Sequence, residues 1–193
     1  MTKTRPDVDT ALLIIDMLNR LDFPQGGKLR PAAEAAAEVI VRLRDQADAA
    51  GAAVIYVNDH HGEWLDDRSA IVARAQEEGS PGRTLAMRLT PRPSDYFVVK
   101  PQFSGFYSTT LPAILPRLGV SRLILTGVAA DICVLFTAAD AHMREYALWV
   151  PADAVASEEE QRTRWALDIM AKSMSADTQP TTQRSLDDWL AAA

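Results

Sequence analysis

Short apolar runs alternate with helix-like segments along this chain, and that alternation constrains its fold more than any other feature. The runs are too short for helices and are typical of buried strands, at residues 11–16, 52–58, 96–100, 122–127 and 147–151. Strands that alternate with helices form βαβ units with right-handed crossovers, which build a parallel sheet. The sequence therefore predicts a doubly wound, Rossmann-like α/β fold with helices on both faces of the sheet.

The segments between these runs predict the helices. The first is expected to begin at Pro31, a favourable first helical residue, and to end at Gly51. A Pro- and Gly-rich connection is expected over residues 80–95. Further helices are expected at residues 68–78, 109–119, 131–146 and 158–172, with a short terminal helix at 185–193.

Length and composition narrow the function classes. A chain of 193 residues fits one domain, expected to span residues 1–193. Its one cysteine cannot form an internal disulfide, residues 1–10 have no apolar leader, and no run approaches the ~18 apolar residues of a membrane span. The net charge is -6 and the sequence has no cluster of basic residues, which argues against a nucleic-acid partner. We expect a cytoplasmic protein that acts on a small molecule, with no nucleic-acid or membrane partner.

Chemically reactive side chains stand at the carboxyl ends of the expected strands. Asp16 ends the first strand, Asn58 and Asp59 end the second, Lys100 ends the third, and the fourth leads through "TGVAAD" to Cys133. In doubly wound sheets, ligands bind beyond these strand ends. The sequence thus predicts that a carboxylate, an ammonium group and a thiol open onto one rim.

The sequence motifs of several enzyme classes that share this architecture are absent from the chain. No G-x-G-x-x-G dinucleotide fingerprint, no G-x-x-x-x-G-K-[ST] phosphate loop and no G-x-S-x-G nucleophile elbow is present. Asp16 is followed by Met17 and Leu18, so it has no second acidic residue two places on, as an aspartyl-phosphate phosphatase would. No cofactor is expected.

The remaining interpretation is a thiol hydrolase. A cysteine in the first turn of a helix feels the positive end of the helix dipole, and Lys100 nearby would lower the pKa of Cys133 further. Asp16 could accept the thiol proton and pass it to a leaving group, and backbone N–H groups of "GVAADIC" suit an oxyanion. Each residue alone has an ordinary alternative: Asp16 in a turn, Lys100 on the surface, Cys133 in the core.

The chain resembles the isochorismatase-like cysteine hydrolase superfamily, which includes nicotinamidases and N-carbamoylsarcosine amidohydrolases. The resemblance rests on "LLIIDMLN", "VVKPQFSGFYSTTL" and "LILTGVAADICVLFTAADA", and it spans nearly the whole chain. It implies a six-stranded sheet, a catalytic triad of Asp16, Lys100 and Cys133, and a cis peptide bond at Val128-Ala129. It also implies an oxyanion hole formed by the Ala129 and Cys133 N–H groups, and a homo-oligomer, a dimer or a tetramer.

Two departures bear on the activity that the resemblance implies. True isochorismatases of the superfamily generally lack the cysteine, so Cys133 favours hydrolysis of a C–N bond in a small amide, ureide or carbamoyl compound. Nicotinamidases carry a metal on an Asp-x-His pair and a more distant histidine. Asp59 and His61 have the pair's spacing, but His60 and His142 are poorly placed as a third ligand, so no metal site is expected.

The pocket walls are expected to come from polar and aromatic residues near the rim. Asn58, Asp59 and His61 are candidate wall or loop-fixing groups. The aromatic candidates are Phe23, Trp64, Phe103, Phe106 and Tyr107, each of which could instead lie in the core or in a subunit interface. The alternatives to a cysteine amidohydrolase are a vinyl-ether hydrolase of the isochorismatase kind and a non-catalytic binding protein of the same fold.

Overall fold

The structure is a computed structural model that describes residues 7–192. Residues 1–6, part of the segment expected to lack an apolar leader, and residue 193, expected to end the terminal helix, lie outside the described residues. The strands are β1 (Thr10–Ile15), β2 (Ala53–Asp59), β3 (Tyr96–Lys100), β4 (Arg122–Val128), β5 (Ala147–Trp149) and β6 (Val155–Ala156).

The α-helices are α1 (Gly26–Ala49), α2 (Arg68–Ala75), α3 (Arg83–Arg88), α4 (Leu111–Leu118), α5 (Leu135–His142), α6 (Glu160–Met174) and α7 (Leu186–Ala191). A π-helical turn, η1 (Ala130–Val134), leads directly into α5. Within residues 7–192, none of the helices combines the length and the apolar character needed to cross a bilayer.

All strands run parallel in one six-stranded sheet of order β3-β2-β1-β4-β5, with β6 paired to β4. The chain builds outward from β1 through β2 to β3 and then returns to the other side of β1 with β4. The sheet therefore has its topological switch point between β1 and β4, where ligands of doubly wound folds bind. The fold predicted from the strand–helix alternation is confirmed.

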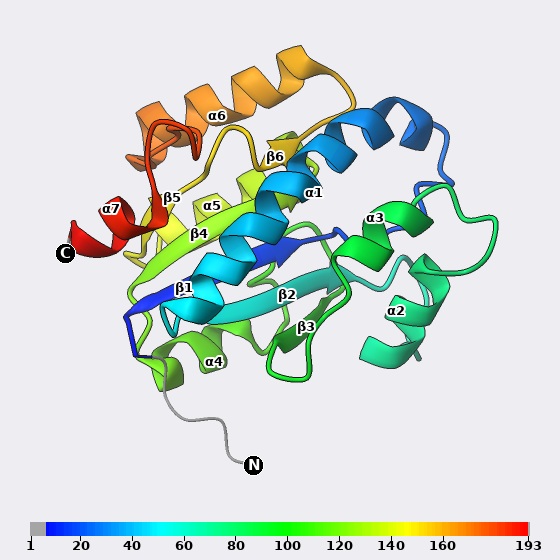
Figure 1. The fold of residues 1–193 in the computed structure, drawn as a ribbon, viewed down its shortest axis with the longest axis horizontal. Helices are drawn as coiled ribbons and strands as arrows, with labels where there is room; N and C mark the ends of the chain where they lie inside the picture. The colour runs from blue at the N-terminus through cyan, green and yellow to red at the C-terminus, as the bar shows by residue number, and fades with distance from the viewer. Residues whose placement is uncertain (1–6, 193) are drawn as a thin grey trace.

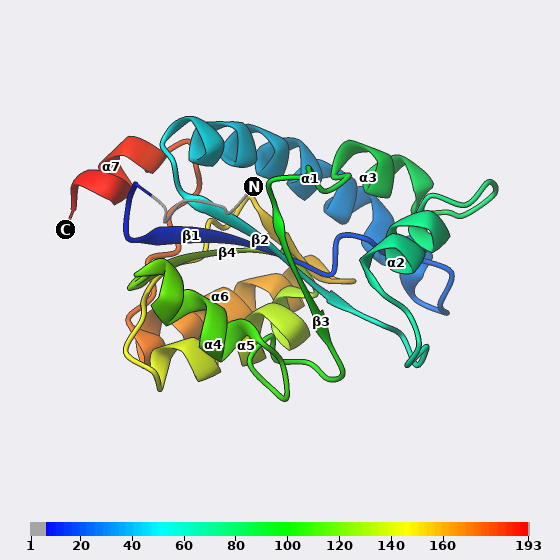
Figure 2. The same ribbon diagram turned by 90° about the horizontal axis from the view of Figure 1, so that it is seen from below.

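Helices cover both faces of the sheet, and each face has its own apolar core (Figures 1 and 2). Residues of α1, α2, α3 and α7 form one core, and residues of α4, α5 and α6 form the other. Strand β1 contributes to both: Leu12 and Ile14 face the first core, and Leu13 and Ile15 face the second. Burial of each such side chain stabilises the fold by roughly 1.5–3 kcal/mol. Because both faces of β1 are buried, its sequence is an unbroken apolar run.

Some elements differ from the sequence expectations. Helix α1 begins at Gly26 rather than at Pro31, which lies inside it. Proline removes its own bond to the carbonyl four residues earlier and its ring crowds that carbonyl, a cost that burial of the apolar face of α1 offsets. The connection over residues 80–95 contains α3, and the short strand β6 follows β5. The helix expected over 131–146 is a π-turn followed by α5, which ends at His142.

Gly127 allows β1 and β4 to approach each other beside the switch point. Its φ is +110°, and a Cβ built on it would lie 2.0 Å from the Ile15 carbonyl oxygen. Both the backbone conformation and the contact exclude a side chain. Because Ile15 precedes Asp16, this glycine also sets the position of the strand end that enters the candidate site.

Gly127→Ala should lower the free energy of unfolding by about 3 kcal/mol or more, because the new methyl group meets backbone and strains φ. Gly27→Ala is the matched control: its Cβ would meet nothing within 4 Å, and alanine favours the helix that contains it. Urea titrations of both variants check this. Equal stability of the Gly127→Ala variant and the wild type would contradict the account.

Candidate active site

Lys100, the last residue of β3, is the centre of a buried cluster of charged and polar groups. Its side chain is fully buried, and its Nζ lies 2.8 Å from Asp16 Oδ2 and 3.2 Å from Asp59 Oδ2. The same nitrogen donates to Cys133 Sγ at 3.4 Å. An ammonium group has three N–H donors, and here each has one acceptor. The structure thus brings the three residues of the expected triad together, with Asp59 as a fourth member.

Asp16 follows β1 directly and adopts a left-handed backbone conformation, with φ of 52°. Few non-glycine residues adopt this conformation, and such strain is concentrated at functional sites. The backbone holds it there: its N–H donates to the Val57 carbonyl at 3.0 Å, and its Oδ1 accepts the Asp59 N–H at 2.7 Å. Its second carboxylate oxygen is thereby turned toward Lys100.

Cys133 lies in η1, the turn that follows β4, and its side chain is half-buried. The Val128-Ala129 peptide bond that precedes the turn is cis, as the sequence resemblance implied. Ala129 is the N-terminal boundary residue of η1, so Ala129 and Cys133 both belong to the connection between β4 and α5.

The pKa of the Cys133 thiol is raised, whereas the sequence predicted that it would be lowered. Burial raises the pKa of Cys133, and the negative charge of Asp16, which also accepts a hydrogen bond from the thiol, raises it further. Lys100 lowers the pKa, as expected, but does not outweigh these two effects. A raised pKa favours the neutral thiol over the thiolate, so a base is needed to remove the proton when the residue reacts.

Lys100 itself is held in its charged form. Burial alone would lower its pKa, but the charge of Asp16, the negative charge that Cys133 carries as a thiolate and the charge of Asp59 together outweigh burial and produce a net rise. A lysine that stays protonated and donates to three acceptors is a poor proton shuttle. Its chemical capacity is electrostatic: it orients the Asp16 carboxylate and attracts developing negative charge on Cys133.

Asn58 and Asp59, at the end of β2, have structural partners. Asn58 Oδ1 accepts the Leu18 N–H, and its Nδ2 donates to the Leu18 carbonyl, both at 3.1 Å, so this buried amide fixes the loop after β1. Asp59 uses one oxygen for Lys100 and the other for the His61 N–H at 2.6 Å.

This donor set does not fit a metal. Both oxygens of Asp59 are already engaged, and the residues that the structure describes contain no group of three or more His, Cys, Asp or Glu side chains arranged to hold an ion. Two candidate ligands make a poor site for zinc or iron.

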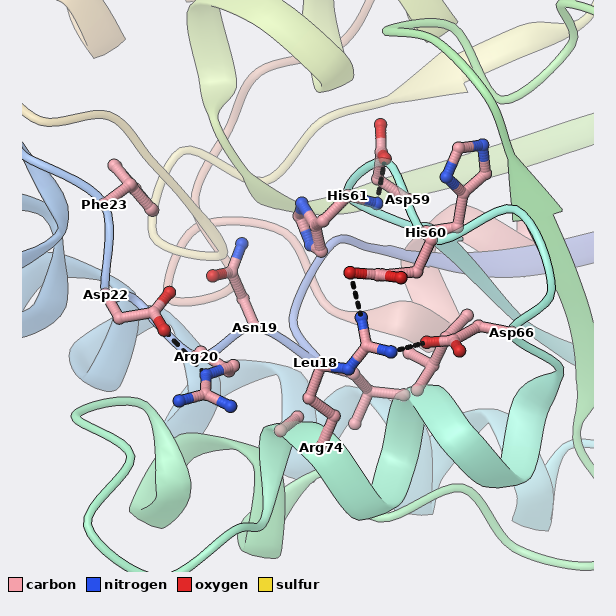
Figure 3. A pocket seen from close by; sticks show the side chains of 13 residues that line it. Leu18, Asn19, Arg20, Asp22, Phe23, Asp59, His60, His61, Asp66 and Arg74 are labelled. Carbon is pink, nitrogen blue, oxygen red and sulfur yellow. Dashed lines mark hydrogen bonds and ion pairs between the residues drawn. The ribbon is translucent and has the colours of Figure 1, made fainter.

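A pocket of about 490 Å³ adjoins the cluster at Asp59, and Figure 3 shows it from close by. Phe23 and His61, two of the expected pocket residues, line it with Asp59. The loop after β1, the loop after β2 and helix α2 supply the walls. The lining residues are Leu18, Asn19, Arg20, Asp22, Phe23, Asp59, His60, His61, Glu63, Asp66, Ile71, Arg74 and Ala75.

The other aromatic candidates lie elsewhere. Phe106 is 3% exposed and belongs to the core on the α5 side, so it cannot line the pocket. Trp64 is 75% exposed and packs against the His60 ring. Phe103 packs against Phe136, while Tyr107 is largely exposed, and neither lies on the pocket wall.

The structure also places residues that the sequence did not single out. Asp131 accepts hydrogen bonds from Ser157 Oγ at 2.6 Å and Arg162 Nε at 2.5 Å, while its N–H donates to the same hydroxyl at 3.2 Å. This network anchors the first residues of η1 beside α6. Arg74 and Arg20 enter the pocket wall from α2 and the β1 loop. Because Ser157 and Arg162 are distant from Asp131 in sequence, no local motif could have indicated that network.

Comparison with known proteins places the chain in a family. The Isochorismatase domain model matches residues 10–183. The chain belongs to the isochorismatase family. The chain is 38% identical over 169 residues to the uncharacterized isochorismatase family protein YaaI of Bacillus subtilis. This match covers 88% of the chain and 92% of YaaI.

Relatives of this isochorismatase-family chain include amidohydrolases. The ureidoacrylate amidohydrolase RutB of Methylorubrum extorquens is 32% identical over 174 residues, covering 77% of this chain and 70% of RutB. The crystal structure of N-carbamoylsarcosine amidase from Thermoplasma acidophilum has a TM-score of 0.71 and 28% identity, covering 92% of this chain and 99% of the amidase. The protein is therefore a hydrolase of the isochorismatase family.

Asp16→Asn should lower the pKa of Cys133, because it removes a negative charge and leaves Lys100 in place. The pH profile of iodoacetamide alkylation measures this directly on the chain's single cysteine. We expect the alkylation midpoint to move down by about one pH unit or more. Asp59→Asn, which removes the other carboxylate on Lys100, should give a smaller shift. An unchanged or higher midpoint for Asp16→Asn would contradict the electrostatic account.

Proposed function

We propose that this protein hydrolyses a C–N bond of a small amide, ureide or carbamoyl compound through a covalent acyl-enzyme on Cys133. One observation carries the proposal: Lys100 Nζ contacts Asp16 at 2.8 Å and Cys133 at 3.4 Å in one buried cluster. A base, a nucleophile and a fixed positive charge within hydrogen-bond reach form an arrangement suited to nucleophilic catalysis.

The first half-reaction begins from the neutral thiol. Asp16 takes the Sγ proton as sulfur attacks the carbonyl carbon, so the C–S bond forms while the carbonyl oxygen becomes an oxyanion. The N–H groups of Ala129 and Cys133 would stabilise that oxyanion. Collapse of the intermediate breaks the C–N bond, and Asp16 returns its proton to the leaving nitrogen, which leaves a thioester on Cys133.

The second half-reaction regenerates the enzyme. Asp16 accepts a proton from water as the water oxygen attacks the thioester carbon. The C–S bond then breaks, the acid product leaves, and the proton returns to sulfur. Lys100 remains charged through both halves, because its role is to orient Asp16 and to stabilise negative charge at sulfur.

The amide class is supported by the relatives and by the nucleophile. Two related proteins act, by name, as a ureidoacrylate amidohydrolase and an N-carbamoylsarcosine amidase. A thiol that attacks a carbonyl carbon suits acyl transfer, and it has no evident use in the hydrolysis of a vinyl ether.

A screen of small amides, ureides and carbamoyl compounds for ammonia or amine release tests the proposal. Wild type should turn over at least one compound, and Cys133→Ala should lose at least about 1000-fold in kcat/KM, since removal of the nucleophile removes the covalent route. Cys133→Ser keeps the shape of the side chain but is a weaker nucleophile, so it should be almost as inactive.

Two outcomes would overturn the proposal. Turnover that persists in Cys133→Ala would favour vinyl-ether hydrolysis or another route without the thiol. Binding of screened compounds without any turnover by wild type would favour a binding protein.

A further inference from the structure

We propose that this hydrolase selects neutral or cationic substrates and rejects carboxylates, because every arginine in the pocket wall is already neutralised by acidic residues. This inference rests on the proposed function and names the substrate class of the same site. The pocket is the one that adjoins the cluster at Asp59, lined by the loops after β1 and β2 and by helix α2.

The pocket and the catalytic cluster share a wall. Asp59 lines the pocket, its Oδ2 lies 3.2 Å from Lys100 Nζ, and that nitrogen contacts Cys133 Sγ at 3.4 Å. Leu18, another lining residue, follows Asp16 by two positions. Asp59 therefore connects the pocket to the cluster, while Asp16, Lys100 and Cys133 do not themselves line the pocket.

Arg74 is the cation nearest the middle of the pocket wall in Figure 3, where it reaches from α2 toward Asp66. Its guanidinium pairs with Asp66 at 2.5 Å and lies 3.9 Å from a Glu63 carboxylate oxygen. Both acids also line the pocket. Because two carboxylates balance the charge of this guanidinium, it gives little net attraction to the carboxylate of a substrate.

Arg20, the other lining arginine, is paired in the same way. Its Nε lies 2.7 Å from Asp22, and its Nη1 lies 2.5 Å from Glu77. Lys100 is likewise committed to its three acceptors, Asp16, Asp59 and Cys133. Among the described residues of the wall, no arginine is left without an acidic partner.

The formal charge of the wall is negative. It holds two arginines against four acidic residues, Asp22, Asp59, Glu63 and Asp66. The His60 Nδ1 accepts the Gly62 N–H at 3.0 Å, so this ring nitrogen is turned toward the backbone. An anionic substrate would meet like charges in a partly enclosed site, where screening is weaker than in open water.

Alkylation of Cys133 by matched reagents tests the inference without a known substrate. Iodoacetamide is neutral and iodoacetate is an anion of nearly the same size, and the chain has one cysteine, so the product is unambiguous. Rates are measured at about pH 8, where an ordinary imidazole is neutral, and are divided by those of a free small thiol. We expect iodoacetamide to be favoured over iodoacetate by about tenfold or more.

The paired substitution Glu63→Gln and Asp66→Asn should reduce this preference by about three- to tenfold, because it frees Arg74 and removes two negative charges. Asp168→Asn is the matched control. Asp168 pairs with Lys172 at 2.7 Å on α6, which packs on the opposite face of the sheet, so its removal should leave the preference unchanged.

Equal normalised rates for the two reagents in wild type would overturn the inference while leaving the proposed function intact. A preference that does not respond to the paired substitution would do the same.

A second readout is the turnover of three ureas that differ only in carrying a carboxylate, a neutral or an ammonium end. The same inference fails if the carboxylate compound is the best substrate. By contrast, a Cys133 that resists iodoacetamide in the folded protein would contradict the proposed function itself.

Discussion

The site depends on the contacts that the ammonium group of Lys100 makes with two aspartates and a cysteine. This group is fully buried and lies within 2.8 Å of Asp16, 3.2 Å of Asp59 and 3.4 Å of Cys133, which come from three different segments. Taking a lysine out of water is costly unless carboxylates compensate, so the two aspartates and the lysine require one another. Removing Lys100 would leave two neighbouring carboxylates without their cation, whereas removing either aspartate leaves Lys100 paired with the other.

The backbone supports this cluster through the topology of the sheet. Strands β1 and β4 are neighbours at the switch point, and the glycine in β4 lets β1 approach closely enough to place Asp16 beside the turn that carries Cys133. Asp16 is held in a left-handed conformation by hydrogen bonds to β2. The same strand supplies Asp59, which both lines the pocket and contacts Lys100 in the cluster.

Sequence reasoning reached the fold and the cluster because both depend on local patterns. Apolar runs of strand length identify β1 to β5, and the residues that end them must meet at one edge of a parallel sheet. The direction of the Cys133 pKa could not be predicted, since it depends on burial and on the closeness of Asp16. Tertiary packing, rather than local sequence, also determines helix α3, the early start of α1 and the pairing of Arg20 with Glu77, so these were missed.

Acid-quenched mass spectrometry during turnover of an amide substrate tests whether the proposed hydrolysis passes through the sulfur of Cys133. A covalent mechanism should give a transient mass increase equal to the acyl group, located on the peptide that contains Cys133 and removed by hydroxylamine. Turnover at the full rate with no adduct on that peptide, under quench conditions that preserve a thioester, would contradict it.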